Sequence, residues 1–353
     1  MFKKLFYRLF NIRSQQTVAE PKSLSKATAS KPHDFSGSPL RQTTIPQPTP
    51  ADLAHEPVDT SALFYNLLFV SQGRDSGGIA NSLERQVMHQ VESALLIPED
   101  IAANILKLPT QAMALNNLLA DDNVDIKDVI LILQRDPVLS AEILKLCNTS
   151  LFRRNEKEVT SIQQAVVQLG RTQLRRLITT CSIKQTMEIK PIYFRRFGAQ
   201  IWRHSMQVAY LCGELAEADV ETAYVVGLLH DVGKIAIFKM LLDTFAQASP
   251  NEQPESRLFK QVMTTKSLLL SAKLTECWDL PSHFSSVLIQ LVNADLSPDS
   301  PMAKVVWRAN LISEASMLKQ ENKLSEGQLN DLLNRVELSY EHFCKYHHKL
   351  QQM

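Results

Sequence analysis

The chain has 353 residues, of which 44% are hydrophobic, and its 38 basic and 37 acidic residues leave a net charge of +1. This length accommodates one large domain with extensions or two smaller domains, and the balanced charge excludes a whole-chain attraction to nucleic acid, so no nucleic-acid partner is expected. Five scattered cysteines without a CxxC pair predict buried thiols in a reducing cytoplasm, not a disulfide framework or a zinc–thiolate site.

Residues 1–13 predict a short basic amphipathic helix, because apolar side chains recur at helical spacing and no acidic residue occurs. The apolar positions are Phe2, Leu5, Phe6, Leu9 and Phe10, and the basic ones are Lys3, Lys4, Arg8 and Arg13. Such a helix could lie on an anionic membrane surface, placing a cytoplasmic protein peripherally at the inner membrane. The alternatives are a helix docked on its own protein or on a partner, or a frayed terminus.

Residues 14–59 predict a disordered linker, because Ser, Thr, Pro, Ala and Gln dominate and the few apolar residues show no period. Residues 60–98 predict a helical extension. The apolar segment ALFYNLLFV and the segment NSLERQVMHQVESALL, with apolar residues at four-residue steps, are separated by the turn-rich SQGRDSGG. These two helices are expected to pack on the following domain or on a partner.

Residues 99–318 predict an all-α domain, since helical periods prevail and no alternating run or Gly-rich phosphate loop occurs. Asp136 before Pro137 predicts a capped helix start. Asn148 is expected to hydrogen-bond nearby backbone at a helix end, and Gly170 predicts a helix stop.

The last element is predicted as one terminal helix over residues 325–350. Ser325 followed three residues later by Gln328 has the spacing of a capping box. The complete chain is therefore expected to be a multi-helix protein with a disordered segment near its N-terminus.

The segment AYVVGLLHDVGKIAIF carries the clearest chemical signal, the adjacent pair His230–Asp231. His204 lies upstream on another predicted helix. Imidazole nitrogen and carboxylate oxygen suit a divalent transition metal, and such a metal acidifies water for attack on phosphorus. The alternative is a hydrogen-bonded core pair in which Asp231 orients the imidazole without any metal.

The order His204, then His230–Asp231, resembles that of HD phosphohydrolases, and the stretch from Leu106 to about Glu314 resembles the HDOD domain in particular. The matching segments are LPTQAMALNNLL, LILQRDPVLSAEILKLCNTSLF, SIQQAVVQLGRTQLRRL, IWRHSMQVA, GLLHDVGKIAIF and LTECWDLP. The resemblance implies an all-helical regulatory module of a bacterial signalling pathway that binds a protein partner. The alternatives are a metal-dependent phosphohydrolase acting on a nucleotide or cyclic dinucleotide, and a nucleotide-binding sensor without turnover.

Four positions depart from the pattern of the catalytic relatives. Asn310 stands where those relatives place a late Asp, Ser267 where many place a His, and Leu291 and Val292 where they place a His pair. The resemblance therefore implies that His204, His230 and Asp231 form a vestigial metal site. We expect no catalytic residues and no cofactor, with at most a weakly bound divalent metal.

A few basic residues are candidate contacts for an anion or a partner. They are Lys234, Arg171, Arg175 and Arg176. The resemblance implies that a Lys in the position of Lys234 can contact phosphate, and the basic group in RTQLRRL could bind an anion or an acidic partner. The alternative in each case is a solvated helix end or helix face.

Overall fold

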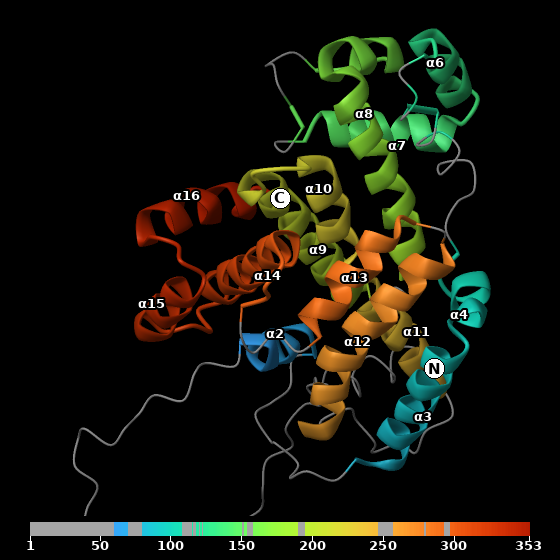
Figure 1. Ribbon diagram of the computed structural model, residues 1–353. Coiled ribbons are helices and arrows are strands. Elements are labelled where there is room, and N and C mark those ends of the chain that lie inside the picture. The colour runs from blue at the N-terminus through green and yellow to red at the C-terminus, as the bar shows by residue number, and fades with distance from the viewer. Residues whose placement is uncertain are drawn as a thin grey trace, which may run out of the picture. The chain divides into compact units, whose positions relative to one another are not determined.

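All regular elements in the described part of the chain are α-helices (Figure 1). The computed structural model describes residues 60–69, 80–107, 115, 118–119, 121, 123–149, 152–153, 158–189, 195–245, 257–278, 280–292 and 297–353. The all-α prediction is confirmed. The basic segment 1–13 and the linker 14–59 lie outside the described residues. No helix within the described ranges combines the length and the apolar character needed to cross a membrane.

The centre of the fold is a layer of three packed helices. They are α9 (Arg195–Leu215), α10 (Val220–Leu229) and α14 (Pro301–Gln320), and each contacts the other two. Beside them run α11 (Val232–Phe245), α12 (Arg257–Cys277) and α13 (Ser282–Leu291), with α12 between the other two. Helix α10 is apolar over most of its length and largely buried, which places the residues that follow it in the core.

A second group of helices forms the N-terminal half of the predicted domain. It consists of α6 (Ile126–Gln134), α7 (Pro137–Cys147) and the long α8 (Ile162–Met187), which also reaches α10. The predicted break at Gly170 is confirmed, since its φ of 73° lies in the left-handed region and kinks α8.

The local signals at both ends of α7 act as predicted. Asp136 Oδ1 accepts a hydrogen bond from the Leu139 amide at 2.9 Å and caps the helix. Asn148 Nδ2 donates to the carbonyls of Leu144 and Val159, and its Oδ1 accepts from the Val159 amide, all at 2.9 Å. Asn148 thereby joins the end of α7 to the segment that precedes α8.

The two helices predicted in the extension are α2 (Thr60–Phe69) and α3 (Ser82–Leu96), and the short α4 (Pro98–Asn104) follows. Helix α3 packs on α11 and α12. Helix α2 packs across α14, α9 and α12, and its side chains Phe64, Tyr65, Leu67 and Leu68 are buried.

The single terminal helix predicted over 325–350 is wrong. The segment forms two helices, α15 (Glu326–Arg335) and α16 (Tyr340–Gln351). Glu337 adopts a left-handed φ of 53°, which ends the first helix, and Ser339 caps the second. The predicted capping box of Ser325 and Gln328 is present.

Candidate metal centre

Two glycines allow the helices of the candidate site to approach one another. A Cβ at Gly227 would lie 2.7 Å from the sulfur of Cys212, so this glycine permits close packing of α10 on α9. A Cβ at Gly233 would lie 2.0 Å from the carbonyl oxygen of Ser267, so α11 can approach α12 only with glycine at this position. This packing brings the end of α10 against α9 and α14.

Four side chains meet in the core at this point, and we call them the histidine centre. They are His204 from α9, His230 and Asp231 from the turn between α10 and α11, and Asn310 from α14. The two imidazole Nε2 atoms lie 3.2 Å apart, and Asn310 Oδ1 lies 3.0 Å from that of His204 and 3.2 Å from that of His230. Asp231 oxygens lie 3.5 Å from each Nε2.

Backbone carbonyls fix the tautomers of both imidazoles. The Gly227 carbonyl can only accept, so His230 Nδ1 donates to it at 2.7 Å and Nε2 keeps its lone pair. For His204 the tautomer is fixed through two other side chains. Gln207 Nε2 donates to the Leu350 carbonyl, which leaves Gln207 Oε1 to accept the hydrogen bond from the Ser313 hydroxyl. His204 Nδ1 therefore donates to Ser313 Oγ at 2.9 Å, and its Nε2 also presents a lone pair to the centre.

Asn310 adds a third acceptor to these two lone pairs. Its Nδ2 donates to Glu314 Oε1 at 3.2 Å, which turns Oδ1 toward the imidazoles. The donor atoms of His204, His230 and Asp231 lie within 4.8 Å of one another. This convergence of acceptors fits a divalent transition metal in geometry and in donor type.

Burial keeps both imidazoles neutral. It lowers the pKa of His204 to about 3 and also lowers the pKa of His230, in each case against the attraction of Asp231. Burial alone would raise the pKa of Asp231, but the Lys234 ammonium beside its carboxylate opposes burial and helps to hold that pKa below its ordinary value. Asp231 is thus the ionised group of the centre.

The charge of Asp231 is already compensated by a neighbour within the fold. Lys234 Nζ lies 2.8 Å from Oδ1 and 2.9 Å from Oδ2 of this carboxylate. A metal at the histidine centre would therefore share its only charged ligand with an ammonium group. The residues fit a divalent cation in geometry, but they offer little net negative charge to hold it.

Helix α2 covers the centre. The Phe64 ring lies 4.6 Å from the His204 ring between centroids, and Lys234 Nζ lies 5.7 Å from the centroid of Phe64. Under α2 a cavity of about 10 Å³ remains beside Phe64, Lys234 and Glu314, and it has room for a single water at most. Phe64 is 1% exposed, so α2 closes the centre to solvent on this side.

Sequence reasoning missed Glu314 and Phe64. Burial raises the pKa of Glu314 to about 7, although Lys234 and hydrogen bonds from Asn310 and Thr60 oppose the rise. Glu314 lies four residues after Asn310 on α14, a spacing that places both on one helical face and could have indicated it. Nothing in the local sequence of α2 indicates that Phe64 meets His204.

The three other positions that depart from the catalytic pattern take no part in the hydrogen bonds of the histidine centre. The Ser267 hydroxyl donates to the Thr264 carbonyl within α12. Leu291 is buried at the end of α13, and Val292 follows it. Within the described residues, none of the three has a hydrogen bond to the centre.

The basic candidates divide by their contacts. Arg171 donates to the carbonyls of Asp121 and Val124 at 2.6 and 2.5 Å and so ties α8 to the segment before α6. Lys234 is paired with Asp231 rather than solvated. Arg175 and Arg176 instead border a cavity beside α10.

Comparison with known proteins identifies relatives. The family model described as HDOD domain matches residues 105–292. An uncharacterised protein of Treponema pallidum (strain Nichols) is 24% identical over 221 residues, a match that covers 59% of this chain and 42% of that protein. The chain thus spans less than half the length of this relative.

Two crystal structures from Shewanella amazonensis SB2B have similar folds. A candidate phosphohydrolase is 23% identical with a TM-score of 0.52, covering 74% of this chain and 94% of that one. A candidate metal-dependent phosphohydrolase is 18% identical with a TM-score of 0.56, covering 77% and 99%. At these identities the similarity shows a shared fold.

Proposed function

Because the chain belongs to the HDOD domain family, we propose that it is a non-catalytic regulatory module of bacterial signal transduction that acts by binding a protein partner. The observation that carries this proposal is the closure of the histidine centre by α2. Hydrolysis needs a substrate phosphate within reach of the metal ligands. Phe64 lies against His204, and the cavity of about 10 Å³ beside Phe64 and Lys234 is too small for a phosphate ester, which supports a closed centre.

The charge distribution supports the same proposal. Lys234 forms an ion pair with the Asp231 carboxylate. Asn310 supplies a neutral amide oxygen at a position where a second negative charge would strengthen metal binding. The proposed role of the hydrogen bonds around the centre, made by Gly227, Ser313 and Lys234, is to hold α9, α10, α11 and α14 in one arrangement. A rigid helical platform can then present its surface to a partner.

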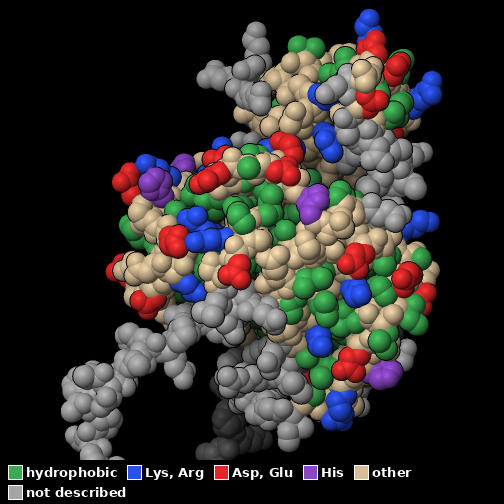
Figure 2. Space-filling model, in the orientation of Figure 1, with side chains coloured by type: hydrophobic (Ala, Val, Ile, Leu, Met, Phe, Trp, Pro, Cys, Tyr) green, Lys and Arg blue, Asp and Glu red, His purple; other side chains and the backbone are tan. Residues whose placement is uncertain are grey.

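The surface offers apolar contacts that such a partner could cover. Val167 on α8 is 85% exposed, and Leu96 at the end of α3 is 83% exposed. Figure 2 shows further hydrophobic side chains at the surface where α3, α4 and α12 lie. Exposed large apolar side chains favour a protein interface where they gather.

A metal-dependent phosphohydrolase is the second candidate, and the convergence of acceptor atoms at the histidine centre favours it. A divalent metal held by His204, His230, Asp231 and Asn310 would acidify a bound water. In that case this chain's own contribution would be to orient the imidazoles through Gly227 and Ser313.

Metal analysis with a hydrolysis assay separates the two candidates. We expect substoichiometric metal in the purified protein and no turnover of bis(p-nitrophenyl) phosphate or cyclic dinucleotides with added Mn²⁺ or Ni²⁺. Stoichiometric metal together with hydrolysis that disappears in Asp231→Ala would establish the phosphohydrolase instead. Partner binding is tested by purification of the intact protein from its own cells, with Val167→Asp as the surface variant. The proposal requires that one partner co-purifies repeatedly with the wild type. Less of that partner should co-purify with Val167→Asp or with Leu96→Asp.

A further inference from the structure

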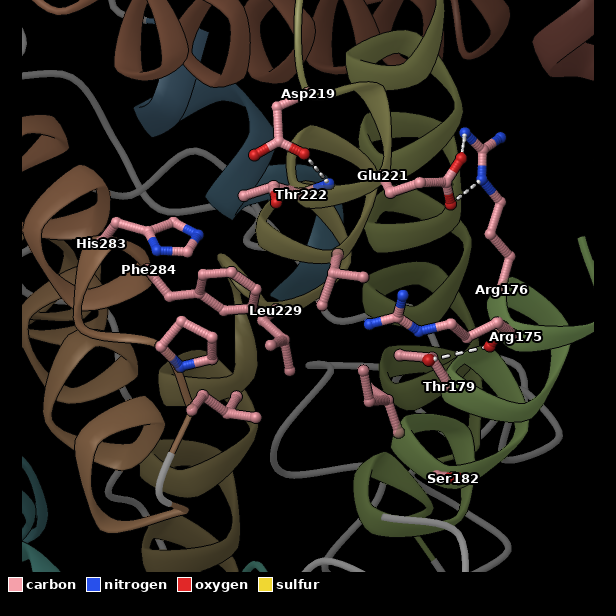
Figure 3. Close-up of a pocket in the computed structure, with 14 residues that line it drawn as sticks. Arg175, Arg176, Thr179, Ser182, Asp219, Glu221, Thr222, Leu229, His283 and Phe284 are labelled. Carbon is pink, nitrogen blue, oxygen red and sulfur yellow. Dashed lines mark hydrogen bonds and ion pairs between the residues drawn. The ribbon is translucent and has the colours of Figure 1, made fainter. Parts of the chain in front are cut away.

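A cavity of about 280 Å³ lies where the two halves of the helical domain meet (Figure 3). Its walls come from α8, from α10 and from the first turn of α13. None of the four side chains of the histidine centre lines it, although Leu229 in its wall directly precedes His230. Ligand sites form preferentially at such junctions between structural units.

One polar wall of the cavity is fixed by an ion pair between the halves. Arg176 donates from Nε and a terminal nitrogen to both oxygens of Glu221, at 2.7 and 2.5 Å. Its guanidinium also lies 5.0 Å from the centroid of the Tyr224 ring. These contacts pair the charge of Arg176 with Glu221 and hold its side chain in place, so this residue builds the wall of the cavity.

The neighbouring Arg175 has a different position. Its side chain is exposed and points into the cavity from α8 (Figure 3). Within the part of the chain that the structure describes, its guanidinium has no ion pair or hydrogen bond. Thr179 on the same helix and Thr222 on α10 add hydroxyl groups to the lining.

The opposite wall is mostly apolar, with His283 as its one titratable side chain. Val225 and Leu229 from α10 meet Leu280 and Phe284 near the start of α13, and the Phe284 ring projects toward Leu229 (Figure 3). This wall offers a flat hydrophobic surface opposite a free guanidinium. A ligand with a ring and one charged oxygen group would satisfy both sides.

Charge and size restrict the ligand further. Asp219 and Glu221 also line the cavity, so a polyanion such as a triphosphate would face two carboxylates as well as Arg175. A volume of about 280 Å³ lies at the small end of ligand pockets, which suits a single ring system and not a dinucleotide.

We propose that this cavity binds a small amphipathic anion, with one carboxylate or phosphate group on Arg175 and an aromatic or apolar ring against Phe284 and Leu229. Such a ligand would contact α8 on one side and α10 and α13 on the other. Its binding would stabilise the junction of the two halves. The site and its test are independent of whether the protein binds a partner.

The test uses the full chain and three matched probes in ligand-observed NMR titrations. Phenyl phosphate and benzoate carry the two anionic groups on a ring, and benzyl alcohol is the uncharged match. At least one anion should bind saturably and about tenfold or more tighter than benzyl alcohol, as expected for a charge-assisted hydrogen bond. The preferred anion then distinguishes a phosphate from a carboxylate ligand.

Variants locate the binding. Arg175→Gln should lower the affinity for the anion about tenfold or more. Arg135→Gln, which removes an exposed guanidinium at the end of α6, should leave that affinity unchanged. Thr222→Trp should fill the cavity and abolish binding of all three probes. Circular dichroism melts check that each variant is folded. If Thr222→Trp does not fold, the comparison of Arg175→Gln with Arg135→Gln still tests the proposal.

The proposal is overturned by any of four results. The anions could bind no tighter than benzyl alcohol, or show no saturable binding in the millimolar range. Arg175→Gln and Arg135→Gln could weaken binding equally, which would indicate diffuse surface attraction. A folded Thr222→Trp variant could bind like the wild type, which would place the probes elsewhere.

Discussion

At the scale of single residues, Asn310 determines how much negative charge the histidine centre offers a cation. Asn310→Asp places a carboxylate where the amide oxygen lies 3.0 Å from His204 Nε2. We expect the affinity for Mn²⁺ or Ni²⁺, measured by calorimetry, to rise about tenfold or more. Without metal the variant should be less stable, because the new carboxylate cannot donate to Glu314.

The matched control is Asn334→Asp, a substitution at an exposed position on α15. It should change neither the metal affinity nor the stability without metal. An unchanged metal affinity in Asn310→Asp would contradict the view that missing charge limits metal binding. Hydrolysis is not expected to return, since α2 still covers the centre.

Glu314 gives the protein a pH dependence of known sign. Burial raises its pKa from 4.5 to about 7, so between these values the folded chain keeps a proton that the unfolded chain has released. Stability from this group is complete below pH 4.5 and falls as the pH rises to about 7. His204, with its pKa lowered from 6.5 to about 3, acts in the opposite direction between those values.

Glu314→Gln isolates the contribution of the carboxyl group. Relative to the wild type, the free energy of unfolding of the variant should rise by up to about 3 kcal/mol between about pH 4.5 and about pH 8. Urea unfolding at several pH values measures it. A difference between variant and wild type that stays constant with pH would show that Glu314 titrates normally.

At the scale of elements, α2 is the helix that separates the histidine centre from solvent. Phe64→Ala removes the ring that lies against His204 and under Lys234. The loss should cost about 3–5 kcal/mol, as for other buried Phe truncations. Because water then reaches the centre, the pKa of His204 should rise from about 3 toward 6.5, which NMR titration can follow.

Leu133→Ala is the matched control, since Leu133 is 0% exposed but lies on α6, away from the histidine centre. It should be similarly destabilising and should leave the His204 titration where it is. Equal titration curves in the two variants would mean that α2 is not the cover of the centre.

The start of α7 depends on one cap. Asp136→Ala removes the acceptor of the Leu139 amide and should cost about 1 kcal/mol of stability. Asp128→Ala, an exposed first-turn acid on α6 that does not cap it, should change stability by less than about 0.5 kcal/mol. If denaturant melts give Asp136→Ala the stability of the wild type, the residue faces a partner and does not support its own helix.

At the scale of the whole molecule, the predicted linker separates the basic segment 1–13 from the helical domain. Deletion of residues 1–13 should leave the melting temperature of the domain unchanged within about a degree, because no domain contact is expected to be lost. A marked fall would show that the segment is structural. Co-sedimentation of the full chain, but not of the deletion variant, with anionic vesicles at low salt tests the membrane interpretation.

The sequence by itself determined the features that depend on neighbouring residues. Asp136 capped α7, Gly170 kinked α8 and Ser325 opened α15, because capping and backbone preferences act within a few residues. The pairing of His204 with His230 was also predictable once the resemblance was recognised. The terminal helix was predicted wrongly because the break at Glu337 carries no Gly or Pro signal.

Only the tertiary structure decided which helix covers the centre and where the cavity between α8, α10 and α13 lies. Phe64 reaches His204, and Arg176 reaches Glu221, across separations of sequence that no local pattern encodes. The raised pKa of Glu314 likewise arises from burial beneath α2 and not from its neighbours along α14. Desolvation and packing depend on which helices meet, so these properties became visible only when the helices were assembled.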